Sequence, residues 1–581
     1  MTHQDPHQKS ESSAVKPPHL APEPSPMNLG PLHDFNTARP QVLADVIQES
    51  YSSLVEQPLD ILLGETLYSE RLRMKRFRPN LFTKQRQKVD QQLWASVYAS
   101  LLKPAAEVDR KVVLQNIITH YADEIGGHFD PKIYNVAIHA VPWGMNWLLN
   151  AASVRRFSPW GMTQSVTSRL HISGEVKQLQ NLAKKGTILL VPTHQSNIDS
   201  IIIGYVIYLM SLPPFAYGAG LNLFSNPLLS FFMSRLGAYT VDRNKSNLIY
   251  KQTLKNYSTR ILQHGIHSIF FPGGGRSRSG AIESHLKLGL LGTALDAQQA
   301  GMIRGADQSK VFIVPMVMSY HFVLEASSLI ENYLADLGKH RFLPMRDESW
   351  QIRRVLGFFW KFFSSQNNLS IRVGKPLDVF GNFVDEEGES IGPHGLRVDT
   401  GLWLKSHGEL QRDMQRDQEY VRELGERLTD RFHHEKTVLT SHLVAFSFFE
   451  ALRMKYPDYD LFRFLRLSPA QRALQIEDFL PIADQFYQRV IQRAKAGGFY
   501  LSSELQSAKD TRSWVLKGAQ QLGIFHEAKV VQVADGVITT EDMSLLYYYR
   551  NRLAGYGFSR LARENHLRSG YGKKDSQGFL E

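Results

Sequence analysis

The stretch TILLVPTHQSNIDSIIIGYVIYLM, residues 187–210, has the pattern that decides the fold. It begins with a β-branched and aliphatic run, continues through a polar segment and ends in an apolar run of helical length. This order predicts a buried strand, a turn and a helix. His194 lies in the turn and Asp199 at its end. The sequence therefore places a histidine at the carboxyl end of a strand.

His194 and Asp199 are five residues apart. On a regular helix this spacing points the two side chains in different directions, so pairing them requires the non-helical turn that Ser196 and Asn197 can supply. A neutral imidazole can take a proton from an attacking alcohol while a carboxylate on its other nitrogen fixes the tautomer. We expect His194 as general base and Asp199 as its orienting partner. Without further motifs, a histidine and an aspartate at this spacing more often have a structural role than a catalytic one.

Short β-branched runs separated by helix-length stretches continue on both sides of this segment, over residues 166–380. The runs are GTILLVPT (186–193), PFAYGAG (214–220), LGAYTVDR (236–243), HSIFFPGG (267–274), KVFIVPMVMSY (310–320) and LSIRVGKPL (369–377). Because such alternation is typical of strands joined by helices, it predicts an α/β domain.

Three further regions flank the predicted α/β domain. Residues 1–40 hold eight of the 26 prolines, and this composition cannot bury enough apolar surface to offset the ordering entropy, so we expect a disordered tail. Residues 41–165 show apolar residues three and four apart and predict an N-terminal helical domain. Residues 381–581 begin with an acidic linker containing glycine and then have a mainly helical pattern.

The second chemically informative segment is HSIFFPGGGRSRSG, residues 267–280. Its three successive glycines allow close backbone approach and positive φ angles. Arg276 and Arg278 offer planar donor forks that suit phosphate oxygens. The spacing is not that of a nucleotide-binding phosphate loop, and a solvated basic loop would have the same composition. A phosphorylated acceptor is a hypothesis that follows from this segment.

These elements, in this order, resemble the glycerol-3-phosphate acyltransferase family, within the wider glycerolipid acyltransferases of the HxxxxD type. The first family motif is matched by the histidine and aspartate described above. The second resembles GLNLFSNPLLSFFMSRLGAYTVDR, residues 220–243, where Gly237 and Arg243 occupy the family's glycine and phosphate-binding arginine positions. Asp242 stands where a second basic residue is common in the family.

The third family motif is similar to FPGGGRSRSG, residues 271–280, with a downstream Lys-x-Gly at Lys287 and Gly289. The fourth resembles IVPMVMSY, with Pro315 and Tyr320. The resemblance implies substrate binding by the motif residues Arg243, Gly274, Arg276, Ser277, Arg278 and Lys287.

One departure from the family pattern concerns Gly273, because the family normally has glutamate between the proline and the glycine of the third motif. The lost carboxylate is expected to change acceptor binding or weaken activity. Outside the motifs, YADEIGGHFDPKIYNVA (121–137) and VLTSHLVAFSFF (438–449) resemble segments of longer bacterial and organellar members, so the resemblance runs from about residue 90 to 570.

The resemblance implies an α/β domain with a mixed or mostly parallel sheet, flanked by helical regions. It also implies transfer of a fatty acyl group from acyl-CoA or acyl carrier protein to the sn-1 hydroxyl of glycerol 3-phosphate, the first step of phospholipid synthesis. We expect direct attack on the thioester, with backbone amides near the histidine turn as oxyanion donors, and no other cofactor or metal. The alternatives are another acceptor, such as dihydroxyacetone phosphate, or an inactive membrane-associated homologue.

The composition and net charge of the chain restrict the kinds of site and of binding partner that it can have. Apolar residues make up 43% and charged residues 21%, as in ordinary globular proteins, and the absence of cysteine excludes disulfides, thiolate nucleophiles and cysteine metal sites. A net charge of +11 favours anionic partners such as lipid headgroups, phosphorylated substrates or acidic carrier proteins. We expect no nucleic acid partner, because no recognition motif accompanies the charge.

Two aromatic segments with flanking cations, VPWGMNWLLNAASVRRFSPWGM (141–162) and RRVLGFFWKFFSS (353–365), suit a membrane interface or a core with a solvated edge. No signal or transit peptide is visible. We therefore expect a peripheral or monotopic protein on the cytoplasmic side of a bacterial inner membrane. His433, His434 and His442 lack a convincing set of metal ligands, and a surface or core role is favoured.

Overall fold

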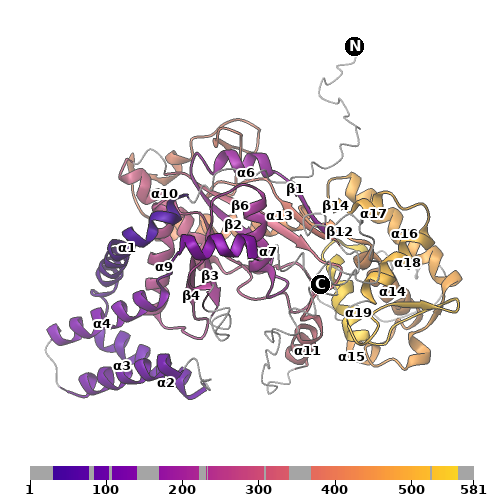
Figure 1. Ribbon diagram of the computed structural model, residues 1–581, viewed down its shortest axis with the longest axis horizontal. Helices are drawn as coiled ribbons and strands as arrows, with labels where there is room; N and C mark the ends of the chain where they lie inside the picture. Colours follow the sequence, from indigo (N-terminus) through magenta and orange to yellow (C-terminus); the bar gives the residue numbers. More distant parts are fainter. Residues whose placement is uncertain are drawn as a thin grey trace, which may run out of the picture.

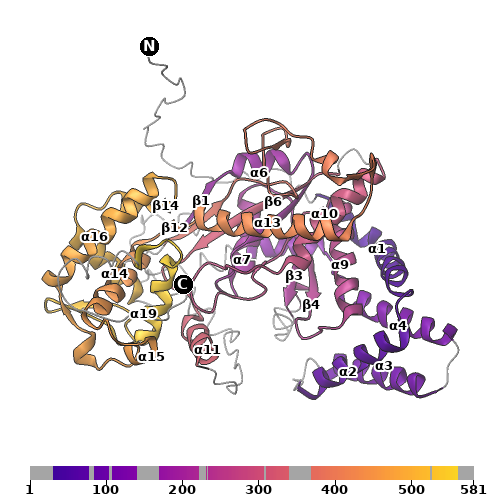
Figure 2. The ribbon, with the colours of Figure 1, turned by 180° about the vertical axis from the view of Figure 1, so that it is seen from behind.

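A central sheet with helices on both faces lies between two helical parts, one from each end of the chain (Figure 1). The computed structural model describes residues 30–76, 84–103, 107–140, 169–220, 231, 233–305, 309–338, 368–523 and 526–559. Seen from behind, α13 (Met414–His434) runs across the sheet (Figure 2). The predicted α/β domain with flanking helical regions is confirmed.

The described residues before the sheet include the helices α1 (Gly30–Leu54), α2 (Leu59–Arg76), α3 (Lys84–Leu102) and α4 (Glu107–Ile125), and residues 131–140 are helical as well. Because α1 begins at Gly30, residues 30–40 are helical, and the prediction of a disordered tail to residue 40 was wrong at its end. Leu32 and Phe35 are buried in the packing of this helix. The proline-rich composition of residues 1–40 gave no indication of these two buried contacts.

Seven strands form the main sheet: β1 (Leu170–Gly174), β2 (Thr187–Pro192), β3 (Ala216–Gly220), β4 (Ala238–Val241), β5 (Ser268–Ile269), β6 (Val311–Ser319) and β7 (Leu369–Val373). Each of the six predicted runs contains one of these strands. The strand that was not predicted is β1, at the sheet edge, where only Leu170 is buried.

The strand order is β1-β7-β6-β2-β5-β3-β4. Only β6 and β7 pair antiparallel, and all other neighbours in this sheet are parallel. The expected mixed or mostly parallel sheet is therefore confirmed. Because parallel strands end at the same edge, the segments that follow β2, β4, β5 and β6 lie along one edge of the sheet. Each family motif contributes one of the residues that follow these strands, namely His194, Arg243, Arg276 and Tyr320.

Both faces of the sheet are covered, which explains the uninterrupted apolar run of β2. Ile188 and Leu190 pack with the helices on one face, and Leu189 and Val191 with those on the other. The covering helices are α6 (Val176–Leu182), α7 (Asp199–Leu209), α9 (Leu248–Gln263), α10 (Leu288–Ile303) and α13.

The C-terminal part is organised around α14 (Thr440–Lys455), whose residues 440–452 are all buried. Its neighbours include α16 (Ile476–Lys495), α18 (Thr511–Leu522) and α19 (Met543–Arg550). Further helices among the described residues are α11 (Ala326–Leu337), α15 (Leu461–Phe464) and α17 (Ser503–Gln506), with short 3-10 turns at Thr400–Leu404, Pro469–Arg472 and Asn551–Leu553.

Short strands complete the described part of the C-terminal region. They are β8 (Phe383–Val384), β9 (Ser390–Ile391), β10 (Lys405–Ser406), β11 (Glu409–Leu410), β12 (Thr437–Val438), β13 (Leu474–Gln475), β14 (Tyr500–Leu501), β15 (Gln532–Ala534) and β16 (Val537–Thr539). All of them pair with each other in small sheets of two or three strands.

The division of the chain into four regions stays a prediction. Helix α13 lies beyond residue 380, yet its Leu424 and Leu428 are buried in the same core as α10 of the α/β domain. No helix among the described residues combines the length and the apolar character needed to cross a membrane. The aromatic segments at 141–162 and 353–365 lie outside the described residues.

Candidate active site

The candidate site is built on the turn between β2 and α7. After β2 ends at Pro192, four residues without helical structure precede the helical turn into α7, which begins at Asp199. This turn brings His194 Nδ1 to 3.0 Å from Asp199 Oδ2. The predicted pairing of histidine and aspartate is therefore present in the structure, and it depends on the non-helical turn that the sequence indicated.

Four donors hold the buried Asp199 carboxylate. Its Oδ2 accepts the backbone N–H groups of Gln195 at 2.6 Å and Ser196 at 2.9 Å, in addition to the His194 ring. Its Oδ1 accepts the hydroxyl of Tyr320 at 2.6 Å, from the end of β6. A carboxylate held at both oxygens fixes the histidine tautomer with a proton on Nδ1, which leaves Nε2 as the proton acceptor.

The environment of His194 favours a neutral imidazole. Burial is the largest effect and lowers the pKa of His194, while Asp199 raises it and the charges of Arg243 and Arg276 lower it again. The ring stacks on Phe271, with ring centroids 4.1 Å apart. Since the net pKa lies below its ordinary value, the imidazole is unprotonated at neutral pH and can act as a base.

The glycine-rich turn after β5 lies directly against the histidine turn. The backbone N–H of Ser277 donates to the His194 carbonyl at 2.8 Å. Gly274 has a φ of +69°, and a Cβ there would lie 2.9 Å from Cγ of Lys287, so the lysine stem packs across this glycine. The close approach explains why a residue without a side chain is needed at this position.

Two arginines face the histidine. Arg276 lies 3.4 Å from the buried Glu325, and its side chain is 12% exposed. Arg243 keeps an exposed surface, and a Cβ on Gly275 would lie 3.7 Å from its Nη1. Withdrawal from water and then the charge of Arg276 lower the pKa of Arg243. Two cations whose charges act on each other and on His194 are suited to bind an anion.

Residues 173–319 match the family model described as Acyltransferase. This segment is an acyltransferase domain. Its limits enclose the histidine turn, the glycine-rich turn and the strands that carry them.

Curated relatives extend the comparison beyond the acyltransferase domain. The glycerol-3-phosphate acyltransferase of Aeromonas hydrophila subsp. hydrophila is 27% identical over 286 residues, which cover 49% of this chain and 31% of the relative. That of Pseudomonas paraeruginosa is 26% identical over 267 residues, covering 46% and 28%. The chain therefore spans less than a third of the length of these relatives. The resemblance to this family that the motifs indicated is confirmed.

A further relative and a solved structure are also similar. The glycerol-3-phosphate acyltransferase of Pseudoalteromonas translucida is 29% identical over 217 residues, covering 37% of this chain and 23% of the relative. The crystal structure of the 1-acyl-sn-glycerophosphate acyltransferase from Thermotoga maritima has a TM-score of 0.23 and 17% identity, over 57% of this chain and 85% of that chain.

Not all predicted binding residues of the acyltransferase domain face His194. Arg278 forms an ion pair with Asp336 of α11, and both side chains are exposed. The hydroxyl of Ser277 donates to the Ala281 carbonyl at 2.6 Å, inside its own turn. Lys287 is exposed and precedes α10. The structure thus places Arg243 and Arg276 near His194 and Arg278 against a neighbouring helix.

Two carboxylates near the site were not identified from the sequence. Glu325 accepts the Ser196 hydroxyl at 2.8 Å and the Asn197 N–H at 3.0 Å, and burial raises its pKa. Glu283 accepts the His194 N–H at 3.0 Å. Neither belongs to a family motif that the sequence showed, and only the folded chain brings them to the turn.

The same contacts change the expectation about oxyanion donors. The four backbone N–H groups from His194 to Asn197 all donate to carboxylates. The expectation that amides of this turn bind an oxyanion is therefore not supported for these four groups.

Asp242, which departs from the second motif, points away from the candidate site. Its carboxylate is buried and lies 3.8 Å from Nη1 of Arg73, a residue of α2. The same polar cluster contains Asp90, His120 and Glu124, which are close enough together to hold a metal ion. Arg73 pairs with Asp90, and Lys245 pairs with Glu124. Protein cations thus already neutralise two of these three groups.

The histidines of the C-terminal region have structural partners. His442 is buried, and its Nε2 lies 2.9 Å from the Tyr320 carbonyl oxygen. His434 Nδ1 lies 2.9 Å from the Gly497 carbonyl oxygen, and His433 stacks edge-on against Tyr556. None of them belongs to a group of possible metal ligands among the described residues.

The C-terminal region also contacts the glycine-rich turn. The Asn551 side chain donates to the Ser279 carbonyl at 2.9 Å. A Cβ on Gly280 would lie 2.2 Å from the carbonyl oxygen of Tyr548, in α19. The backbone N–H of Val323 donates to the hydroxyl of Tyr549 at 3.0 Å. The turn that carries the arginines is therefore shaped partly by residues far along the chain.

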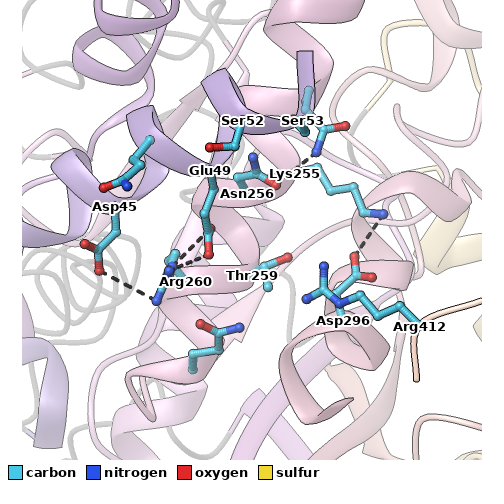
Figure 3. Close-up of a pocket in the computed structure, with 13 residues that line it drawn as sticks. Asp45, Glu49, Ser52, Ser53, Lys255, Asn256, Thr259, Arg260, Asp296 and Arg412 are labelled. Carbon is cyan, nitrogen blue, oxygen red and sulfur yellow. Dashed lines mark hydrogen bonds and ion pairs between the residues drawn. The ribbon is translucent and has the colours of Figure 1, made fainter. Parts of the chain in front are cut away.

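A polar groove between α1 and α9 is separate from the candidate site (Figure 3). Five of its charged side chains form ion pairs with one another. Arg260 lies 3.6 Å from Asp45 and also pairs with Glu49, while Lys255 lies 2.9 Å from Asp296. None of the predicted site residues lines this groove, and its polar lining does not suit an acyl chain.

Proposed function

We propose that this protein transfers a fatty acyl group from an acyl thioester to the sn-1 hydroxyl of glycerol 3-phosphate. The observation that carries the proposal is the ring of His194, held 3.0 Å from Asp199 and close enough to Arg243 and Arg276 for both charges to lower its pKa. A base and a cationic anion site side by side suit an acceptor that bears both a hydroxyl and a phosphate. The names of the relatives support the same acceptor.

In the proposed reaction the acceptor hydroxyl gives its proton to Nε2 of His194 while its oxygen attacks the thioester carbonyl. The carbon–oxygen bond forms, the carbon–sulfur bond breaks, and the imidazolium returns the proton to the leaving thiolate. Asp199 stabilises the imidazolium between these steps. General-base help of this kind is worth about 10² to 10⁴-fold in rate.

The phosphate of the acceptor binds between the two arginines. Arg243 has no acidic partner among the described residues, whereas Arg276 shares its charge with Glu325. A phosphate dianion offsets the repulsion between the two guanidinium groups and holds the hydroxyl at the base. Arg278, bound to Asp336, takes no direct part in this arrangement.

The donor is acyl-CoA or acyl carrier protein, and the reaction requires no further cofactor, because the acceptor attacks the thioester directly. The protein works at the cytoplasmic face of a bacterial inner membrane, as a peripheral or monotopic protein. The bacterial origin of the relatives and the net charge of +11 support this location.

The test measures acyl transfer by the purified protein for each combination of donor and acceptor. The donors are acyl-CoA and acylated acyl carrier protein, and the acceptors are glycerol 3-phosphate and dihydroxyacetone phosphate. We expect the fastest product formation with glycerol 3-phosphate. His194→Ala should abolish turnover with an unchanged melting temperature. The control His285→Ala, at an exposed histidine that follows the glycine-rich turn, should leave turnover unchanged.

Other outcomes of the test select the alternatives. Faster turnover with dihydroxyacetone phosphate would show that this compound, and not glycerol 3-phosphate, is the preferred acceptor. The departure from the family pattern at Gly273 is the reason to test it. Wild-type protein that transfers no acyl group with any pair would favour an inactive homologue. Turnover retained by His194→Ala would overturn the assignment of the base.

A further inference from the structure

The departure at Gly273 has a counterpart in space. A Cβ built on Gly273 would lie 2.8 Å from Cγ of Glu283 and 3.3 Å from its Oε1. Gly273 does not have a positive φ, in contrast to Gly274. The backbone at this position therefore admits any residue, and the neighbouring glutamate side chain is what excludes one.

Glu283 uses that space to reach the catalytic turn. Its Oε1 accepts the backbone N–H of His194 at 3.0 Å. The other three amides of the turn, at Gln195, Ser196 and Asn197, donate to Asp199 or Glu325. Without Glu283 the first amide of the turn would lose its acceptor. This loss would be costly, because an N–H group withdrawn from water needs a hydrogen-bond partner.

We propose that Glu283 replaces the carboxylate that the third motif lacks at Gly273, and that it acts as a positioning residue for His194. The side chain of a glutamate at residue 273 would begin in the space that the Glu283 stem now fills, so only one of the two carboxylates fits. Glu283 acts through the backbone of the base and touches neither substrate. The inference rests on the proposed acyl transfer.

The protonation of Glu283 helps to select the variant that should disturb the contact with His194 least. Burial raises the pKa of Glu283 to about 7, the charge of Asp199 also raises it, and Arg552 lowers it. Either protonation state keeps an oxygen that accepts the His194 N–H. Glutamine keeps such an oxygen as well, with nearly the same shape, so Glu283→Gln is the conservative variant.

The decisive experiment is an exchange of the glutamate between the two positions. We expect Glu283→Ala to lower kcat by about 10- to 100-fold, with KM for both substrates little changed, since the backbone N–H of His194 loses its acceptor. Gly273→Glu alone should lose at least as much, because two carboxylates compete for one space. The double variant Gly273→Glu/Glu283→Ala should recover to within about tenfold of the wild type, and Glu283→Gln to within about threefold.

Matched controls separate positioning from general damage. Glu527→Ala removes an exposed glutamate of the C-terminal region and should change neither kcat nor the melting temperature. A double variant no faster than Glu283→Ala would overturn the replacement. Glu283→Ala with wild-type kcat would overturn the positioning role.

A second measurement does not depend on turnover. Diethylpyrocarbonate modification can be followed by mass spectrometry on the peptide that carries His194. We expect faster modification of His194 in Glu283→Ala, with the wild-type rate restored in Glu283→Gln and in the double variant. An unchanged rate in Glu283→Ala would refute the positioning role even if the wild type transferred no acyl group, so failure of this inference and failure of the proposed function remain distinguishable.

Discussion

The two turns that form the candidate site differ in how their polar groups are satisfied. In the histidine turn each backbone N–H from His194 to Asn197 donates to a carboxylate. At the glycine-rich turn the guanidinium groups have unequal partners: Arg276 lies near Glu325 and Arg278 pairs with Asp336. The first turn is fixed before substrate arrives, while the second lies beside Arg243, whose charge has no acidic partner among the described residues and stays available to a ligand.

This difference indicates a division of labour. A base must be held in one orientation, because a small misplacement of a reacting group costs rate. An anion site works through charge, which acts over a longer distance and tolerates some movement. Variants of the histidine turn should therefore lower kcat, whereas variants of the arginines should raise KM for the phosphorylated acceptor.

Among the variants that keep His194, the largest effect is expected for Asp199→Asn. An amide cannot stabilise the imidazolium as a carboxylate does, and its NH2 group can occupy the place of an acceptor for Nδ1–H. We expect kcat to fall by about 10² to 10⁴-fold. Steady-state kinetics on protein with a native circular dichroism spectrum checks this, and a loss that appears only in KM would contradict the assigned role.

The second effect compares two arginines that the sequence treated alike. Arg243→Ala should lower kcat/KM for glycerol 3-phosphate by about 100-fold, mainly through KM, because it removes one charged contact to phosphate. Arg278→Ala is the matched control and should change kcat/KM by less than about threefold, since an exposed ion pair contributes little. Equal losses in both variants would remove the distinction between them.

A third, smaller effect is expected for Tyr320→Phe. The variant removes the hydroxyl that donates to Asp199 Oδ1 and leaves the carboxylate and the histidine in contact. We expect kcat to fall by about tenfold and the free energy of unfolding to drop by about 1–3 kcal/mol. Urea unfolding and initial rates measure both, and an unchanged kcat would show that the hydroxyl does not support the pair.

The pH profile provides the most subtle test. The pKa of His194 is lowered, so kcat/KM should rise with pH through a midpoint below 6.5 and stay level above it. The Arg243 charge contributes to this lowering. In Arg243→Ala the midpoint should therefore move to higher pH, because the imidazolium becomes easier to form. A midpoint that stays in place would show that Arg243 does not act on the base.

The sequence predicted the parts of the site that lie close together along the chain. His194 and Asp199 are separated by one turn, and six strands were recognised from their β-branched runs. The strand β1 was missed because, as an edge strand with one buried residue, it lacks the apolar run of the inner strands. The start of α1 was missed because the burial of Leu32 and Phe35 is tertiary.

The carboxylates that hold the turn could not be predicted in this way. Glu283 lies 89 residues from His194 along the chain, and Glu325 lies 128 residues from Asn197. Neither has a local pattern that separates it from a solvated glutamate. For Arg278 the motif indicated binding, while the ion pair with Asp336 depends on where α11 folds.

The contact of Gly280 with Tyr548 has a practical consequence for protein engineering. A carbonyl oxygen of α19 occupies the place where any side chain at residue 280 would start. A shortened protein cut after β7, the last strand of the main sheet, would thus lose a contact that shapes its glycine-rich turn. A minimal version of the candidate active site should therefore keep the sequence through α19.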